Sequence, residues 1–423
     1  MYVDLARPLA PGETTVFDLA YSFNIPEHGA DRMGREGSLY EIAQWYPRMA
    51  VYDDVHGWNT DQYLGQGEFY LEYGDIDYEV TLPAGYIVAG TGGLQNPDQV
   101  LTPTQRSRLA TALKSDSTVA IITPDELASG AARPRRDGTV TWRFRAERVR
   151  DVAWAASPDY RWDASGWDGT LAQAYYRNDA RDTWEDAAKM SRYSILEYST
   201  RWFRYPYPQI SAIEGPVSGM EYPMVAMTPA DRMRTNQNWR EALYNKPAVG
   251  LVLLREHITS PDRFDPVFRE YIRRWSFKHP TPADFFRTME DGLGEDLSWF
   301  WHSWFYTTDR LDQAVDSVAV ADSAGILSRV YLRNVGEMPM PVELALTMDD
   351  GSAQRIRLPV EIWGLRNSYT ALVAGPKKVT GVVIDPDGWY PDVDRSNNRW
   401  PPAPAAGAPA SASTGAPPAG TTK

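Results

Sequence analysis

The stretch Gly219-Met220-Glu221-Tyr222-Pro223-Met224 lies near the middle of the chain, after a short apolar run and before a long helical half. The carboxylate of a glutamate in such a short turn can anchor a cationic group. The helical half begins at Tyr244-Asn245-Lys246-Pro247, and a tyrosine that enters a helix can donate a hydrogen bond to a developing oxyanion. Glu221 and Tyr244 are therefore the first candidates for a functional site.

The composition is that of a folded protein with two or three domains, because 423 residues exceed the usual size of one hydrophobic core. Hydrophobic residues make up 43% and charged residues 23%, which is ordinary for globular proteins. The net charge of −13 argues against a nucleic-acid surface. The lack of cysteine excludes disulfides, thiol nucleophiles and cysteine-ligated zinc, and it is compatible with both the cytoplasm and the periplasm.

The sequence shows neither a membrane span nor a secretion signal. No apolar run reaches the roughly 18–20 residues that a transmembrane helix needs. Residues 1–5 lack the basic region and the apolar core of a signal peptide. They resemble the interior of a β-strand, so we expect the chain to begin partway through a domain.

Residues 1–160 are expected to form an N-terminal β domain. The range 76–82 alternates apolar and polar residues, which is typical of a half-buried strand, and 68–73 is predicted to be another strand. One helix is predicted from Pro103 to Lys114, because Thr102 is a good N-cap and proline suits the first helical position.

Residues 161–312 are expected to form a largely helical domain. The range 184–202 carries apolar residues at spacings of three and four, which predicts one long helix. A short strand over 209–214 then leads to Gly219. Helical spacing returns from 246 to 306, where aromatic side chains are expected to pack between helices.

Residues 313–393 are expected to form a C-terminal β domain, in which two alternating runs around Asp349-Asp350-Gly351 predict a hairpin. The spacing of the later aspartates does not fit a calcium loop, so a surface turn is predicted for Asp385, Asp387, Asp392 and Asp394. Residues 394–423 are rich in Pro, Ala, Gly and Ser, which predicts a disordered tail or linker. The predicted fold class is α+β with several domains.

Five motifs occur in the same order in bacterial members of the aminopeptidase N family of zinc metallopeptidases, which this sequence resembles over roughly residues 1–390. The motifs are Gln44-Trp45-Tyr46-Pro47-Arg48, Asp151-Val152-Ala153-Trp154-Ala155, Gly219-Met220-Glu221-Tyr222-Pro223, Tyr244-Asn245-Lys246-Pro247 and the aromatic helix from Asp296 to Tyr306. Each is weak alone, and together they are specific. The resemblance implies a saddle-shaped N-terminal β domain, a catalytic domain of the gluzincin type and a β-sandwich-like C-terminal module.

The resemblance also implies roles for single residues. In the family, the glutamate of the Gly-x-Met-Glu turn binds the free α-amine of a peptide, so Glu221 would bind peptide N-termini, with Gly219 and Met220 shaping the approach. Tyr222 stands where the family commonly has asparagine and completes the expected substrate-binding set. Tyr244 occupies the position of the family's transition-state tyrosine. Members of this type are often exported, which favours a periplasmic or extracellular location.

The family's zinc site is missing from this sequence. The family binds zinc through His-Glu-x-x-His, whose two histidines face one metal, and a further glutamate on the next helix. No two histidines here are four residues apart; they are His28, His56, His257, His279 and His302. The 22 residues from 222 to 243 contain none. Two ligand helices with their turn need roughly 25–35 residues, which is more than these 22 residues can supply. We therefore predict that the chain has no zinc or other cofactor and is catalytically defective.

Two hypotheses from different classes follow. In the first, the chain derives from a zinc aminopeptidase that has lost its metal-binding segment. Residues 228–241 would then be a short polar segment that joins the two sides of the deletion. In the second, the chain is a non-catalytic peptide-binding or scaffold protein that uses the Glu221 turn to hold N-termini. Without the metal, a structural role has the same weight as the functional role for both Tyr244 and Glu221. The structural role of Tyr244 would be packing or a hydrogen bond at a helix start. That of Glu221 would be a salt bridge or a turn hydrogen bond.

Overall fold

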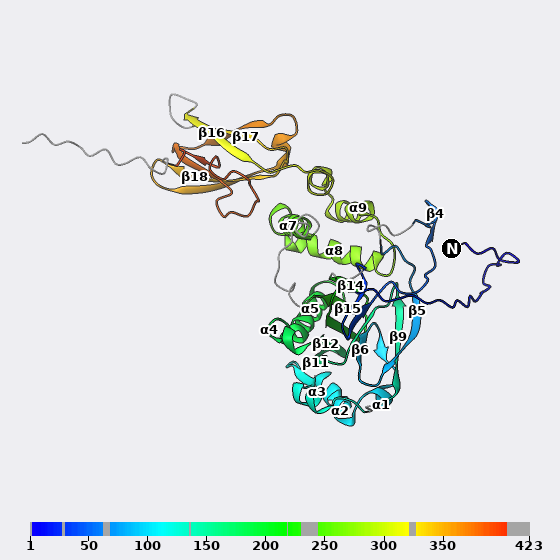
Figure 1. The fold of residues 1–423 in the computed structure, drawn as a ribbon. Coiled ribbons are helices and arrows are strands. Elements are labelled where there is room, and N and C mark those ends of the chain that lie inside the picture. The colour runs from blue at the N-terminus through cyan, green and yellow to red at the C-terminus, as the bar shows by residue number, and fades with distance from the viewer. Residues whose placement is uncertain are drawn as a thin grey trace, which may run out of the picture. The chain divides into compact units, whose positions relative to one another are not determined.

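The structure is a computed structural model that describes residues 2–27, 30–61, 68–134, 137–217, 219–229, 244–320 and 327–403. The chain forms two compact units, and helices and strands occur in both (Figure 1). The first unit contains Met1–Thr235 and Phe277–His279, and the second contains Asn236–Ser276 and Pro280–Lys423. The mixed α+β class is therefore as predicted. The saddle, gluzincin and sandwich shapes and the domain boundaries at 160, 312 and 393 stay predictions.

The largest sheet of the first unit positions the candidate site. Its strands follow the order β14-β15-β13-β12-β11-β8, so β14 forms one edge. Two of its strands, β12 and β15, run parallel to β13, which lies between them. The strands are β8 (Val119–Ile122), β11 (Arg161–Trp167), β12 (Thr170–Tyr176), β13 (Gln209–Glu214), β14 (Met220–Tyr222) and β15 (Val225–Thr228).

Three smaller sheets complete the described part of the first unit. One has the order β1-β2-β10-β6 and consists of β1 (Met33–Glu36), β2 (Leu39–Ile42), β10 (Trp154–Ser157) and β6 (Ile87–Gly90). Another consists of β5 (Gly74–Pro83), β9 (Thr139–Val149) and β7 (Gly93–Leu94). The last is the pair β3 (Tyr52–Asp53) and β4 (Gly57–Trp58). The buried side chains of the first two of these sheets share one hydrophobic core with the large sheet.

In the first unit, the structure confirms the predicted helix cap at Thr102, whereas the helix bounds differ from the predicted ones. They are α1 (Pro97–Val100), α2 (Pro103–Ala112), α3 (Pro124–Ser129), the 3-10 turn η1 (Asn178–Ala180), α4 (Arg181–Trp184) and α5 (Ala187–Arg201). At α2, the Thr102 hydroxyl accepts from the Gln105 N–H and the Gln105 side chain accepts from the Thr102 N–H, which forms a capping box. The long helix predicted over 184–202 is confirmed as α5, and only its start differs. The helix begins at Ala187, after a break that follows α4, where Trp184 packs into a separate small core with Tyr176.

The strand predicted over 68–73 is wrong, because this segment joins no sheet. Its side chains contact other parts of the unit. Glu68 forms an ion pair with Arg32, and the Tyr70 hydroxyl donates to Asp53 at 2.7 Å. Side-chain contacts of this kind, with residues distant in sequence, leave no periodic pattern in the sequence.

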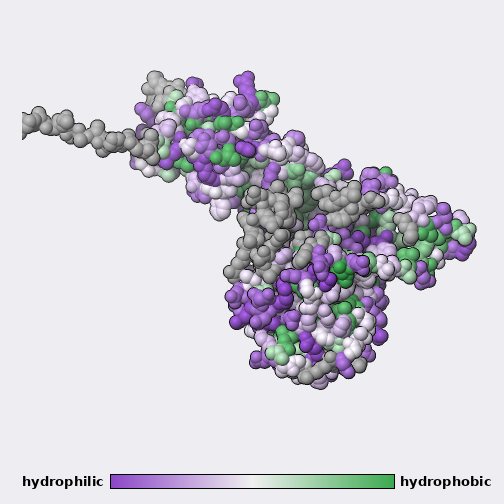
Figure 2. Space-filling model, in the orientation of Figure 1, coloured by the Kyte–Doolittle hydropathy of each residue, from purple (hydrophilic) through white to green (hydrophobic). Residues whose placement is uncertain are grey.

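The segment 2–24 contains neither helix nor strand. Its large apolar residues are exposed, and they include Val16, Phe17, Leu19, Tyr21 and Phe23. Figure 2 shows apolar and hydrophilic residues side by side where this segment lies. Phe17, Leu19, Tyr21 and Phe23 alternate with smaller or polar residues, the pattern of a half-buried strand, yet they join no described sheet.

The helices of the second unit pack through aromatic side chains, as predicted. They are α7 (Lys246–Leu253), the π-helical turn η4 (Leu254–Ile258), α8 (Pro261–Trp275), α9 (Pro282–Leu293), α10 (Ser298–Trp301) and the π-helical turn η5 (His302–Tyr306). The rings of Phe286 and Trp301 stack with centroids 4.6 Å apart, and Phe300 is completely buried beside them. The helical core therefore rests on ring contacts.

Two sheets of the second unit share one core. One has the order β16-β17-β20 and the other β19-β18-β21-β22. The elements are β16 (Gln313–Val320), β17 (Leu327–Asn334), β18 (Val342–Met348), β19 (Ala353–Leu358), the 3-10 turn η6 (Val360–Trp363), β20 (Ser368–Ala374), β21 (Val379–Ile384) and β22 (Arg399–Trp400). The predicted hairpin is confirmed as β18 and β19.

The turn predicted around Asp385 is present, and Asp385 itself is buried. Its carboxylate accepts hydrogen bonds from the N–H groups of Trp389 and Tyr390, each at 2.9 Å. The carboxylate therefore stabilises the turn. Of the tail predicted over 394–423, residues from 404 onward lie outside the described residues, and the first part contains β22, which pairs with β21. None of the described helices combines the length and the apolar character that crossing a membrane requires.

Candidate functional site

The edge strand β14 presents the candidate carboxylate. It pairs antiparallel with β15, so that Glu221 lies opposite Ala226. Side chains alternate between the faces of a strand. Tyr222 is buried, and Glu221 is exposed and has no hydrogen-bond or ion-pair partner in the described part of the chain. The carboxylate that the sequence singles out is thus open to solvent on a sheet edge.

Gly219 lies close to the end of β15. A Cβ at this position would lie 3.0 Å from Thr228 Oγ1, which is tighter than nearly all real contacts of this kind. A larger residue would push β14 away from β15. Gly219 therefore helps to fix the start of β14, while Met220 is partly buried against the core of the unit.

Tyr222 contributes to the core of the unit. Its ring meets the edge of Phe69 with centroids 5.8 Å apart. Burial raises the pKa of the Tyr222 hydroxyl, and the charges of Asp151 and Glu68 raise it further. The part expected for Tyr222 in substrate binding stays a prediction, as do those of Gly219, Met220 and Glu221.

A polar cluster that sequence reasoning missed lies beside Tyr222. Gln44 Nε2 donates to Glu68 Oε2 at 2.7 Å, and the Arg32 guanidinium forms an ion pair with the same carboxylate at 2.8 Å. Gln44 has a φ of +53°, a left-handed conformation that is costly for a residue with a side chain. Gln44 is the first residue of the motif at 44–48. Its place in that motif was the only feature of the sequence that pointed to this cluster.

Two of the quoted motifs meet at a buried ion pair. Tyr46 donates to Asp151 Oδ1 at 2.9 Å, and Arg48 donates to Asp151 Oδ2 at 2.7 Å. Burial raises the pKa of Asp151, and the Arg48 charge opposes that effect. The motifs at 44–48 and 151–155 thus join two segments of the first unit and have a structural role.

Thr91 links the chain after β14 to the neighbouring sheet through two hydrogen bonds. Its buried hydroxyl donates to the Pro223 carbonyl oxygen at 2.9 Å and accepts from the Ala153 N–H at 3.1 Å. Thr91→Val keeps the shape and removes both hydrogen bonds, so it is expected to destabilise the protein by about 2 kcal/mol in chemical denaturation. Thr91→Ser keeps the hydroxyl and should cost less than about 1 kcal/mol. Equal losses for the two variants would contradict this role.

Tyr244 belongs to the second unit and Glu221 belongs to the first. Tyr244 is half exposed and precedes α7. Two residues later, Lys246 Nζ donates to the carbonyl oxygens of Thr307 at 3.1 Å and of Ser303 at 3.4 Å. Lys246 therefore joins the start of α7 to the end of η5, and the transition-state role expected of Tyr244 stays a prediction.

The part of the chain that the structure describes offers no zinc site, and the absence of zinc from the whole chain stays a prediction. The described residues contain no group of three His, Asp or Glu side chains arranged as metal ligands. His279 Nε2 lies 2.7 Å from the Leu71 carbonyl oxygen, and the His257 ring lies 4.7 Å from that of Trp389. His28 and the range 230–243 lie outside the described residues. The sequence itself shows that no two histidines have the i, i+4 spacing.

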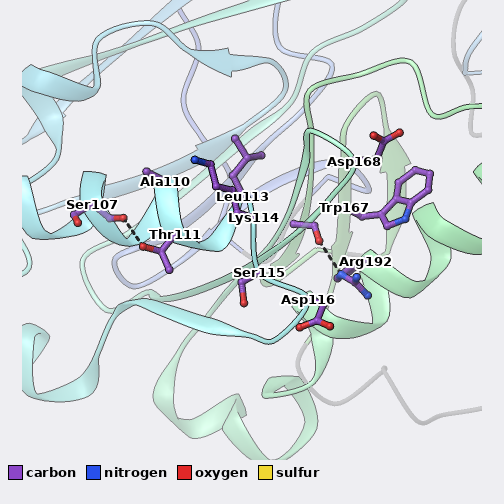
Figure 3. A pocket seen from close by; sticks show the side chains of 11 residues that line it. Ser107, Ala110, Thr111, Leu113, Lys114, Ser115, Asp116, Trp167, Asp168 and Arg192 are labelled. Carbon is purple, nitrogen blue, oxygen red and sulfur yellow. Dashed lines mark hydrogen bonds between the residues drawn. The ribbon is translucent and has the colours of Figure 1, made fainter.

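A cavity of about 970 Å³ lies between the end of α2 and the turn after β11 (Figure 3). Its wall carries both signs of charge, including Lys114, Asp116 and Arg192. Arg192 Nε donates to the Gly166 carbonyl oxygen at 2.8 Å, which joins α5 to β11. None of the predicted site residues lines this cavity, so we do not assign it to the candidate site.

The structure is similar to the crystal structure of Legionella pneumophila aminopeptidase A in complex with aspartic acid, with a TM-score of 0.51 and 9% sequence identity. This chain has an aminopeptidase-like fold. The match covers 83% of this chain and 47% of the other, so the chain spans about half the length of that protein. The identity is too low to carry over more than the fold.

A second similar structure is a mutant form of an M1 zinc metallopeptidase from Deinococcus radiodurans, bound to a Tyr-Ser-Ala substrate. It matches with a TM-score of 0.42 and 11% identity over 66% of this chain and 73% of that chain. No model of a known protein family matches the sequence, and none of the curated protein sequences does.

Proposed function

We propose that this chain is a peptidase-fold protein that holds the amino end of a peptide at β14 without hydrolysing it. The observation that carries the proposal is Glu221, an exposed carboxylate with no described partner on an edge strand. A peptide can add to a sheet edge through main-chain hydrogen bonds, and a carboxylate beside that edge would pair with its ammonium group. The chain lacks the histidine spacing that zinc hydrolysis needs.

The other candidate is an incomplete aminopeptidase that neither cleaves nor binds peptides. The exposure of Glu221 favours binding, because a carboxylate retained only for structure would be expected to have a hydrogen bond or ion pair. Both candidates share the fold of the similar structures, so binding experiments have to separate them.

Isothermal titration calorimetry with a short peptide, in its free-amine and N-acetylated forms, tests the proposal. We expect the free-amine form to bind at least about tenfold more tightly, because a hydrogen bond to a charged group contributes about 1.5–3 kcal/mol. Glu221→Gln should remove this preference. Equal affinities of wild type and Glu221→Gln for the free-amine peptide would overturn the proposal.

Glu185→Gln is the matched control for this experiment. Glu185 is an exposed carboxylate at the end of α4 that pairs with Arg181 at 3.2 Å, and the substitution removes the same charge from the same unit. It should leave the preference for a free amine unchanged. A comparable loss in this variant would mean that net charge, and not Glu221, attracts the peptide.

A further inference from the structure

Two buried carboxylates lie beside the loop that leads to β14. Glu41 on β2 and Glu214 at the end of β13 are both completely buried. Arg177 binds Glu214, with Nη2 at 2.5 Å from Oε1 and Nε at 3.0 Å from Oε2. Tyr160 donates to the Glu214 carbonyl oxygen at 2.7 Å. The Arg177 guanidinium therefore pairs with Glu214, and its charge also acts on Glu41.

Glu41 holds the backbone of the loop Gly215–Val217. The Val217 N–H donates to Glu41 Oε2 at 2.9 Å, although the two residues are 176 positions apart. Gly215 packs so closely on Glu41 that a Cβ there would overlap the carboxyl group. Glu41 Oε1 has no hydrogen-bond partner among the described residues. Since β14 begins at Met220, the position of this loop sets where β14 starts.

We propose that Glu41 is a positioning residue whose neutral carboxyl group holds the loop Gly215–Val217, and with it β14, in the conformation that binds a peptide. This inference rests on the proposed function, because β14 is the proposed peptide site. Ionised Glu41 would be a second buried negative charge near Glu214. A carboxylate accepts the Val217 N–H more strongly than a neutral carboxyl group does, but the cost of the buried charge is relieved when the loop moves away and admits water. The loop would then leave its position on Glu41.

The charges around Glu41 favour its neutral form at neutral pH. Burial and the Glu214 charge raise the pKa of Glu41, the Val217 N–H and Arg177 oppose the shift, and the resulting pKa is about 8. Tyr160 also faces this pair, and Glu36 and Asp179 lie near Arg177. Because the folded-state pKa lies above the ordinary value, the support for the loop is present at low pH and is lost as pH rises through about 8.

The test compares the dissociation constants of a free-amine peptide for wild type and Glu41→Gln at about pH 6.5 and about pH 9. Glutamine mimics the neutral carboxyl group and cannot ionise. The α-amine of the peptide itself titrates near pH 8, and the ratio of the two constants removes that contribution.

We expect equal binding at the lower pH and about tenfold weaker binding by wild type at the higher pH. At one unit above a pKa of about 8, roughly a tenth of Glu41 is still neutral. Equal binding by both proteins at both pH values would overturn the proposal.

Hydrogen exchange of the peptide-free protein gives a second measurement. After correction for intrinsic exchange rates, the range 209–222 of wild type should lose protection with a midpoint near pH 8, and Glu41→Gln should keep its protection. Glu185→Gln should behave like wild type. If no peptide binds at any pH, the proposed function fails, and this measurement still decides the role of Glu41. Protection that does not change with pH in wild type would contradict that role.

Discussion

The purified chain is expected to bind no stoichiometric zinc and to hydrolyse aminoacyl substrates no faster than the background. The zinc site of the aminopeptidase N family needs two histidines on one face of a helix and a third ligand, and this sequence has no histidine pair with that spacing. Enzymes accelerate their reactions by about a millionfold or more, so loss of the metal should remove essentially all turnover. Metal analysis after dialysis against zinc, together with a chromogenic aminoacyl substrate, measures both quantities.

Glu221→Gln, purified in the same way, controls for contaminating aminopeptidases, because a contaminant would be equally active in both preparations. A zinc-loaded aminopeptidase assayed in parallel shows that the substrate is suitable. Strong turnover that a chelator abolishes, present in wild type and lost in Glu221→Gln, would contradict the account. It would mean that ligands other than a His-Glu-x-x-His pair hold the metal.

Arg177→Met is expected to lower the free energy of unfolding by about 3–5 kcal/mol, because it leaves the buried Glu214 carboxylate without a counter-charge. Glu214 is completely buried, and Arg177 donates three side-chain hydrogen bonds to its two oxygens. The Glu214 hydrogen bonds also raise the pKa of Arg177, so the guanidinium stays charged. Such a loss is a large part of the total stability of an ordinary domain. Chemical denaturation followed by tryptophan fluorescence measures it.

Arg181→Met is the control for the buried pair. Arg181 lies four positions away and pairs with exposed Glu185, so its removal should cost less than about 1 kcal/mol. Similar losses for the two arginine variants would show that the buried pair contributes no more than a surface pair. The difference between the variants is therefore the quantity to measure.

Local patterns in the sequence predicted many elements of the fold. The strand predicted over 209–214 has the same bounds as β13, and the caps around Thr102 predicted the start of α2. These succeed because alternation and capping act over a few residues. The wrong strand over 68–73 and the late start of the helix predicted over 184–202 arise where tertiary contacts override the local pattern.

The candidate site could be predicted only in part. The sequence singled out Glu221 but placed it in a short turn, whereas the structure places it on strand β14 with its side chain exposed. Its surroundings are not visible in the sequence, because Gln44 and Glu41 come from more than a hundred positions earlier. A buried acid such as Glu41 also interrupts an otherwise apolar strand without any local pattern that shows its partner. Partners that lie far apart in the sequence can be identified only once the fold is known.

The central claim is that Glu221 binds the α-amine of a peptide, and a four-way calorimetric cycle tests it most directly. Wild type and Glu221→Gln are each titrated with the free-amine and the N-acetylated peptide, and the coupling free energy is calculated from the four affinities. The account predicts a coupling of about 1.5–3 kcal/mol, because only wild type and the free amine form the charged pair. A coupling near zero would contradict it.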